Sequence, residues 1–150
     1  MPQGELPIKT QAEASATIYT DGASRGNPGH ASLGVVIKRK VHKDETLHSY
    51  LGILTNNQAE YSALVAALKR AQKIGIKSLR VLTDSLLLAN QINGLWKVKN
   101  PNIKDLFTEA KALAKQFDSF SIAHIPREQN SEADGLANLA LDDYLNNKGE

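Results

Sequence analysis

The chain has 150 residues, of which 41% are apolar and 23% charged, and its net charge is +2. This length and composition are typical of one soluble globular domain. The chain contains no cysteine, which excludes disulfide frameworks and thiolate zinc sites, so oxygen or imidazole must hold any bound metal. It contains no apolar run long enough to span a bilayer and no secretory signal at its start. We therefore expect no membrane partner and a cytoplasmic location. The small positive charge permits a polyanionic partner without requiring one.

The first third of the chain has the alternation of β-strands. Apolar and β-branched residues predict strands over 16–21, 32–39 and 46–53. The segment GASRGNPGHA, rich in turn-forming residues, is predicted to join the first two strands. The second and third strands are close enough in sequence to pair as a hairpin. We expect a three-stranded antiparallel meander, preceded by a flexible lead-in over residues 1–15.

Helical periodicity then replaces this alternation. Apolar residues at helical spacing predict a helix over 57–74, which Gly75 is expected to end. The elements predicted after it are a strand over 77–84, helices over 85–93 and 103–116, a strand over 120–125, a helix over 132–145 and a tail over 146–150. This order predicts one α/β domain over 16–145. Its mixed five-stranded sheet would have three antiparallel strands, then two parallel ones, and would be flanked by helices.

Four carboxylates lie where the chain passes from one predicted element to the next. Asp21 ends the first strand, Glu60 lies in the first turn of the long helix, Asp84 ends the 77–84 strand, and Asp134 lies in the first turn of the last helix. Functional sites of open α/β sheets gather beyond the strand ends, so these acids could converge. Close carboxylates repel one another unless cations lie between them. Two divalent ions would relieve that repulsion and could also clamp a phosphoryl displacement.

Each acid also has a purely structural interpretation. Residues 57–60 and 131–134 both have the spacing of a capping box, with the acid at its third helical position. Asp84 could cap the helix that follows it, and Asp21 could be a turn residue. Capping does not explain why Glu60 lies on the apolar face of its helix. A carboxylate there must be paired, hydrogen-bonded or bound to metal.

Four segments contain these acids: TDGASRGNPG (20–29), TNNQAEYSAL (55–64), LTDSL (82–86) and HIPREQNSEADGLAN (124–138). In this order they resemble the signature segments of type 1 ribonucleases H. The resemblance implies the family's fold and an endoribonuclease that hydrolyses the RNA strand of RNA–DNA hybrids. It also implies Mg²⁺, or Mn²⁺ as a substitute, held by Asp21, Glu60, Asp84 and Asp134. One ion would activate the attacking water and the other would stabilise the leaving oxygen, giving 5′-phosphate and 3′-hydroxyl ends.

The resemblance also implies contacts with the substrate. The residues that match minor-groove positions, where the 2′-hydroxyl distinguishes RNA from DNA, are Asn27, Asn57 and Gln58. Thr55 matches a residue that binds a phosphate of the DNA strand. His124 matches a histidine that assists proton transfer or product release. The alternative for His124 is a strand-end histidine without a chemical role.

Two further features remain open between a functional and a structural interpretation. Arg127 could hold the scissile phosphate, in which case His124 need not have a chemical role. Trp96, with the lysines of its loop, suits a sugar–phosphate backbone, but it could equally be a partly buried packing residue. The lysines that would position the DNA strand without reading sequence are Lys97, Lys99 and Lys104.

The segment GLWKVKNPNI is the whole predicted connection between the second and third helices. The basic protrusion that many bacterial members carry there is therefore predicted to be absent, and the form HIPREQN resembles archaeal and certain bacterial branches. Rival interpretations are a non-catalytic binding module, a DNA-directed relative such as a transposase or junction resolvase, and a domain of a reverse-transcriptase polyprotein. A non-catalytic module should have lost at least one of the four acids, and all four are present. GNPG and TNNQAE match the segments of the family that contact RNA, which argues against a DNA-directed relative. We expect a stand-alone, monomeric enzyme.

Overall fold

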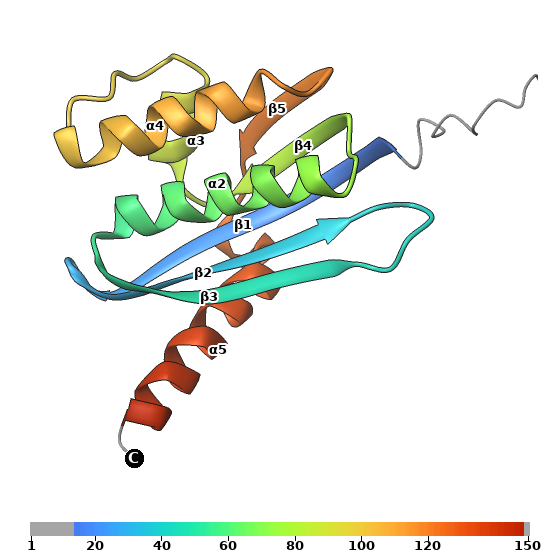
Figure 1. Cartoon of the computed structure of the whole chain (residues 1–150). Coiled ribbons are helices and arrows are strands. Elements are labelled where there is room, and N and C mark those ends of the chain that lie inside the picture. The colour runs from blue at the N-terminus through green and yellow to red at the C-terminus, as the bar shows by residue number, and fades with distance from the viewer. Residues whose placement is uncertain (1–13, 149–150) are drawn as a thin grey trace, which may run out of the picture.

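The computed structural model describes residues 14–148, which form one mixed sheet with helices on both faces (Figure 1). The strands are β1 (Ser15–Gly26), β2 (Gly29–Lys38), β3 (Glu45–Leu54), β4 (Ser78–Thr83) and β5 (Ser119–His124). Their order in the sheet is β3-β2-β1-β4-β5. The pairs β1–β2 and β2–β3 are antiparallel, whereas β1–β4 and β4–β5 are parallel. The predicted sheet is therefore confirmed.

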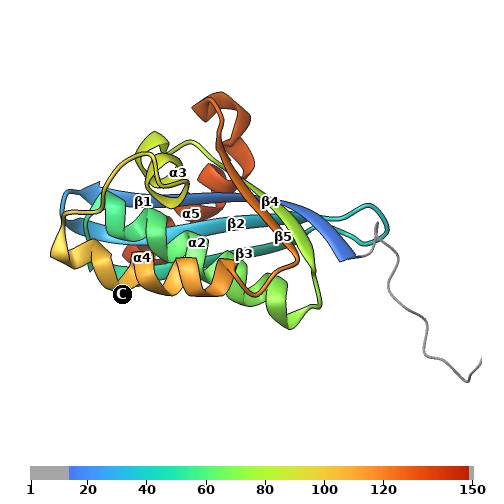
Figure 2. The ribbon, with the colours of Figure 1, turned by 90° about the horizontal axis from the view of Figure 1, so that it is seen from above.

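The helices are α2 (Asn56–Lys73), α3 (Leu86–Ile92), α4 (Pro101–Ala114) and α5 (Ser131–Lys148), with a 3-10 turn, η1 (Arg127–Gln129), before α5. Helices α2 and α4 cover one face of the sheet and α5 covers the other (Figure 1). Seen from above, α2 lies along the sheet with α4 beside it (Figure 2). The central strand β1 is therefore covered on both sides, by α2 and by α5. Most of the predicted lead-in lies outside the described residues, and Ser15 already belongs to β1.

Helix α2 shows how local sequence sets its two ends. Thr55 Oγ1 accepts a hydrogen bond from Gln58 N, and Gln58 Oε1 accepts one from Thr55 N, which makes a reciprocal capping box. At the other end Gly75 has a positive φ of 84°, and Ile76 N donates to Ala71 O, as in a Schellman motif. The predicted stop at Gly75 is confirmed. The capping box predicted over 57–60 is wrong: it lies two residues earlier.

The other two structural interpretations of acids as helix caps also fail. Helix α3 is capped by Ser85, whose side chain accepts from Leu88 N, so Asp84 is not the cap. Helix α5 begins at Ser131, and its first backbone hydrogen bond runs from Asp134 N to Asn130 O. The residue in the capping position is therefore Asn130, not Ser131 as the predicted box over 131–134 required. These carboxylates are left free for other partners.

The β1–β2 hairpin is longer than the sequence predicts. The turn-rich segment after Asp21 continues both strands, with Arg25 paired to His30 and Gly26 to Gly29. Only two residues remain in the turn. Antiparallel pairing continues there because glycines allow the backbones to approach at the tip, where Gly26 has a φ of 114°. As a result, Asp21 lies in the middle of a strand rather than at its end.

A buried network connects the core to the loop between α3 and α4. Tyr61 is 1% exposed and lies among the apolar residues between α2 and the sheet. Its hydroxyl donates to Gln91 Oε1 at 2.7 Å, and Gln91 Nε2 donates to Lys97 O at 3.1 Å. Burial raises the pKa of Tyr61 above its ordinary value. The loop that carries Trp96 is thereby fixed to the core by two hydrogen bonds that are largely shielded from water.

Candidate active site

The structure brings the four acids together from four different elements. Asp21 comes from β1, Glu60 from the start of α2, Asp84 from the residue after β4, and Asp134 from the first turn of α5. Oxygens of Asp21, Glu60 and Asp84 all lie within 4.8 Å of one another. Asp134 lines the same pocket, and its carboxyl is among the groups that raise the pKa of Asp21. Asp21 is 5% exposed and lies at the bottom of the cluster.

Two glycines allow the helices to come this close to the strands. A Cβ on Gly22 would lie 2.2 Å from Ala59 C, so α2 packs on bare backbone beside Asp21. Gly22 N also donates to Glu60 Oε1 at 2.9 Å, which orients that carboxylate. On the other face, a Cβ on Gly34 would lie 2.1 Å from Ala133 O. Gly34 is the cross-strand partner of Asp21, so its lack of a side chain lets α5 carry Asp134 to the site.

The surroundings of three carboxyl groups in the cluster, those of Asp21, Glu60 and Asp84, make their ionisation less favourable. Burial, followed by the charges of Glu60 and Asp84, raises the pKa of Asp21 to about 9. Burial also raises the pKa of Glu60 to about 8, although the hydrogen bond from Gly22 N opposes the shift. The pKa of Asp84 is raised chiefly by burial, while Asn130, Arg127 and His124 lower it. Carboxylates that cannot ionise freely need cations to offset their charge.

These shifts predict how the stability of the metal-free protein depends on pH. The Asp21 carboxyl loses its proton near pKa 3.8 in the unfolded chain but near about 9 in the folded one. Its contribution to stability is therefore fully present below about pH 4 and is lost as the pH rises towards about 9. Asp21→Asn stays neutral, so its melting temperature should exceed that of the wild type by a growing margin over this range.

Thermal melts in a chelator between about pH 4 and pH 9 measure this margin. Asp143→Asn, which removes an exposed carboxylate from α5, is the control and should follow the wild type. A constant difference between Asp21→Asn and the wild type across the range would contradict the raised pKa. Adding Mg²⁺ should raise the melting temperature of the wild type more than that of Asp21→Asn, because a bound ion stabilises only the folded state.

Asn130 is a site residue that the sequence analysis missed. It is 1% exposed, and its Nδ2 donates to Thr20 O at 2.9 Å and to Asp84 Oδ2 at 3.4 Å. The side chain therefore connects the start of α5 with β1 and with the carboxylate of Asp84. Its position four residues before Asp134, at the residue preceding a helix, was the available signal. Asn130 Oδ1 and Thr20 Oγ1 are buried without a hydrogen-bond partner among the described residues.

The acids line an open pocket of about 430 Å³. Two predicted substrate residues, Asn57 and Arg127, also line it. Arg127 is exposed, with Nη2 3.8 Å from Asp134 Oδ1. His124 is exposed at the end of β5, beside the pocket rather than in its wall.

The other predicted contacts divide between structural and free side chains. Asn27 Oδ1 accepts from Asn56 N at 3.0 Å and so ties the β1–β2 turn to the start of α2. Thr55 and Gln58 are occupied by the capping box described above. Trp96 is 46% exposed and lines a separate, largely apolar hollow of about 400 Å³ with Lys97 and Lys104. Lys99 is exposed and does not line that hollow.

Comparison with known proteins agrees with this geometry. A family model described as reverse transcriptase-like matches residues 19–140. The sequence is 43% identical to ribonuclease HI of Halobacterium salinarum, covering 83% of this chain and 63% of the relative. It is 44% identical to the bifunctional protein Rv2228c of Mycobacterium tuberculosis, covering 83% of this chain and 35% of that protein. The chain thus spans between about a third and about two thirds of these relatives.

Solved structures extend the agreement to three dimensions. The crystal structure of RNase H1 from Halobacterium salinarum superposes with a TM-score of 0.83 at 42% identity, covering 86% of this chain and 98% of that one. LC11-RNase H1, solved in complex with an RNA/DNA hybrid, gives a TM-score of 0.82 at 39% identity, covering 87% and 99%. The chain belongs to the type 1 ribonuclease H family, as the sequence predicts. Only residues 93–100 join α3 to α4, so the basic protrusion is absent. Within residues 14–148, no helix is both long and apolar enough to cross a membrane.

Proposed function

We propose that this chain is an endoribonuclease that hydrolyses the RNA strand of RNA–DNA hybrids. The observation that carries the proposal is the convergence of Asp21, Glu60 and Asp84 within 4.8 Å, with Asp134 in the wall of the same pocket. The pocket above them is open and polar, as a nucleic-acid strand requires. A hybrid is the substrate class favoured by the complex of LC11-RNase H1 with an RNA/DNA hybrid.

The residues present fit divalent metal ions. All the donors are carboxylate oxygens, the ligands that hard cations such as Mg²⁺ and Mn²⁺ prefer. Oxygens of three of the acids lie within 4.8 Å of one another, so these carboxylates could hold a divalent ion together. Burial and neighbouring carboxylates raise the pKa values of Asp21 and Glu60, so a cation bound beside them would favour their ionised forms. We infer that the four acids hold two ions, with Mg²⁺ as the metal and Mn²⁺ as its substitute.

Bound at these four acids, the ions would supply an activated water and stabilise the leaving oxygen, and the products would carry 5′-phosphate and 3′-hydroxyl ends. The protein's own groups would do the remaining work. Asn130 holds the Asp84 carboxylate in place, and the Gly22 amide does the same for Glu60. Arg127, whose side chain is 81% exposed, would bind the charged scissile phosphate. His124 would transfer a proton at the rim of the site.

Recognition of RNA would come from the edge of the pocket next to α2. Asn57 lines the pocket and is free to meet a 2′-hydroxyl in the minor groove. Asn27 and Gln58 would also contact the minor groove, although each already makes a structural hydrogen bond, at the β1–β2 turn and at the start of α2. Thr55, the cap of α2, would place the start of that helix against a phosphate of the DNA strand. Trp96, Lys97 and Lys104 would support the DNA strand from the hollow beside α4, and Lys99 would do so from the exposed loop next to it. A monomeric state and a cytoplasmic location stay predictions.

His124→Ala should slow turnover by roughly 10–100-fold, the usual range for one general acid–base group. The reason is its exposed position at the end of β5, beside Asp84, where it can exchange a proton with solvent. Steady-state and single-turnover rates on one hybrid measure the effect, and His48→Ala on β3 is the matched control. Full turnover by His124→Ala would make it a structural strand-end residue and leave Arg127 as the more important group.

The proposal is tested by incubating a strand-labelled hybrid with and without Mg²⁺, beside matched double-stranded DNA and double-stranded RNA. We expect cleavage of the RNA strand only, in the hybrid only, and only with the metal. End-group analysis of the fragments should give 5′-phosphates. Cleavage of double-stranded DNA with an intact hybrid would replace the proposal with a DNA-directed activity. Binding of the hybrid without cleavage under all metal conditions would indicate a non-catalytic module.

A further inference from the structure

The candidate pocket continues well beyond the carboxylates. Its wall includes Arg25, near the end of β1, and Asn138, on the second turn of α5. Arg25 lies four residues after Asp21 on the same strand, a separation of roughly 13 Å at the rise of an extended chain. The pocket is therefore longer than a cluster of metal ligands needs. A strand that enters it extends past the reacting phosphate toward Arg25.

Arg25 is partly neutralised by the protein itself. Its Nη2 lies 2.8 Å from Asp142 Oδ1 and donates to Asn138 Oδ1 at 3.2 Å. The side chain of Arg25 is 40% exposed and that of Asp142 is 56% exposed, so water reaches this ion pair. Within residues 14–148, the Nε and Nη1 donors of Arg25 have no protein partner. One edge of the guanidinium is thus held in place, and the other is open to a second acceptor.

The charges around the pocket show what that acceptor would be. The pocket wall holds four carboxylates and only two cations among the described residues, Arg25 and Arg127. A polyanionic strand lying in the pocket needs positive charge beside the phosphates that metal ions do not reach. Arginine presents its donors as a planar fork that matches two oxygens of one phosphate. Arg127 lies 3.8 Å from Asp134 and is therefore placed to bind the scissile phosphate. Arg25 remains to bind a phosphate farther along the strand.

We propose that Arg25 and Asn138 form a second phosphate subsite, which binds the backbone of the cleaved strand a few nucleotides from the scissile phosphate. Asp142 acts as an internal competitor, because its carboxylate occupies the guanidinium when no phosphate is bound. This proposal rests on the proposed hybrid-cleaving function. Asn138 Nδ2 donates to Asp134 O at 3.0 Å, so the subsite is built on the same helix that carries a metal-site carboxylate. The Asn138 side-chain oxygen accepts from Arg25 Nη2 and so helps to hold the guanidinium at the pocket wall.

The experiment measures KM, kcat and salt dependence for hybrid cleavage by the full chain. Arg25→Ala should raise KM about tenfold with kcat within about twofold, as expected for loss of a charge-assisted contact made equally in ground and transition states. The slope of log affinity against log salt should become shallower by about one unit. Asp142→Asn should lower KM by about two- to fivefold, because it removes a weak, exposed competitor. Arg25→Lys should recover part of the loss.

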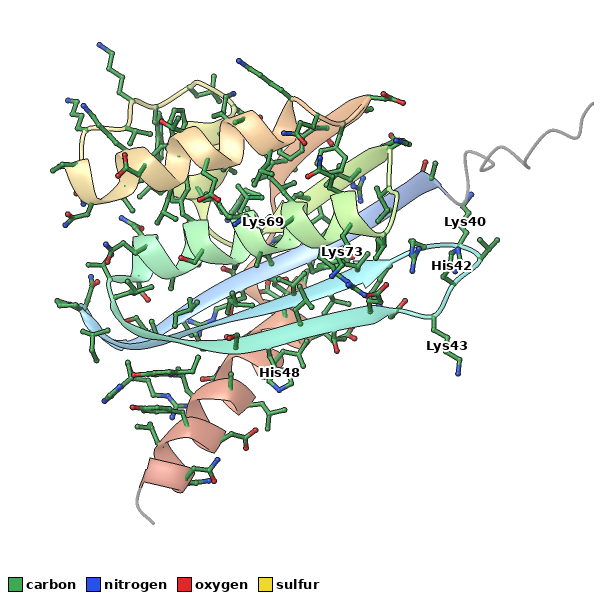
Figure 3. The ribbon with its side chains drawn as sticks, viewed as in Figure 1. Lys40, His42, Lys43, His48, Lys69 and Lys73 are labelled. Carbon is green, nitrogen blue, oxygen red and sulfur yellow. The ribbon has the colours of Figure 1, made fainter. Side chains whose placement is uncertain are left out.

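Matched controls come from the turn between β2 and β3, at the other end of the sheet from the β1–β2 turn. Lys43 lies on this turn with Lys40 and His42 (Figure 3). Lys43→Ala removes the same charge as Arg25→Ala. Asp44→Asn breaks an exposed ion pair with Lys38 of 2.9 Å, much like that of Asp142. Neither control should change KM by more than about twofold, because exposed charges beyond a Debye length of about 8 Å are largely screened at physiological salt.

The opposite signs of the two main variants distinguish binding from a structural role. If the ion pair only tethers α5 to β1, Arg25→Ala and Asp142→Asn should both lower the melting temperature and both raise KM, which would overturn the proposal. An unchanged KM for Arg25→Ala would overturn it too. A wild type that fails to bind and cleave the hybrid would instead remove the proposed function on which the subsite depends. If the wild type cleaves the hybrid, the KM values of Arg25→Ala and Asp142→Asn test the phosphate subsite independently of the proposed function.

Discussion

Replacing Asp84 by asparagine should reduce hybrid cleavage by on the order of 10³-fold or more. Metal ions stabilise charge in the transition state by several kcal/mol, and each 1.36 kcal/mol corresponds to about a tenfold change in rate. Asp84 supplies one of three oxygens within 4.8 Å, so its loss removes a charged ligand from the centre of the cluster. Single-turnover cleavage at saturating enzyme measures the effect on the chemical step without a contribution from substrate affinity.

The fold of this variant should be intact. Asparagine is isosteric with aspartate, and its side-chain oxygen can still accept from Asn130 Nδ2. Because burial and Asp134 raise the pKa of Asp84, removing its charge should leave the melting temperature unchanged or slightly higher. Asp105→Asn, an exposed position on α4, is the control and should keep full activity. Rates close to the wild type for Asp84→Asn would refute the assignment of metal ligands.

The order and type of the elements follow from the sequence because local signals agree with the tertiary environment. Helix α2 has an apolar face that packs in the core and a Gly just after its end, and both of these features have the predicted consequence. The strand β4 lies between β1 and β5, and its apolar residues Leu79, Val81 and Leu82 are buried, as predicted for a central strand, whereas Arg80 is exposed. The convergence of four acids also follows, because topology brings the middle of β1, the end of β4 and the starts of α2 and α5 together.

Other parts of the site depend on tertiary contacts that a sequence pattern does not contain. The competing caps at 57–60 and 131–134 satisfy the same spacing rule, and only the backbone shows that Thr55 and Asn130 are the capping residues. Asn130 meets Thr20 across 110 positions of sequence, so no local pattern indicates this contact. Arg25 was not predicted as a site residue for a related reason. It lies in a segment predicted as a turn, whereas pairing with β2 extends β1 through it.

Gly34 is the position where the fold and the site depend most directly on each other. It does not have a positive φ, so its value lies in lacking a side chain. An added Cβ would lie 2.1 Å from Ala133 O and 2.8 Å from Ala137 N, both in the backbone of α5. A helix backbone cannot rotate away as a flexible side chain can. Any larger residue must therefore move α5, and Asp134 with it, away from Asp21.

Gly34→Ala should therefore destabilise the protein by about 3 kcal/mol or more, at the upper end for overpacking, and lower its melting temperature by roughly 6–12 °C. Gly135→Ala is the matched control in the same helix. A Cβ on Gly135 meets nothing within 4 Å, so the better helix propensity of alanine should raise stability by about 0.5–1 kcal/mol. Denaturant unfolding and thermal melts measure both changes.

Measurements of cleavage well below the melting temperature distinguish a displaced α5 from a fold that is only less stable. Well below its melting temperature, where the chain is fully folded, Gly34→Ala should still cleave hybrid at least about tenfold more slowly, because a misplacement near 1 Å is enough to cost that much. Its affinity for Mg²⁺, followed by the metal-dependent rise in melting temperature, should fall in parallel. Gly135→Ala should keep wild-type values of both. A destabilised Gly34→Ala with full activity and full metal affinity would show that α5 tolerates the shift and that Asp134 does not need its close approach to Asp21.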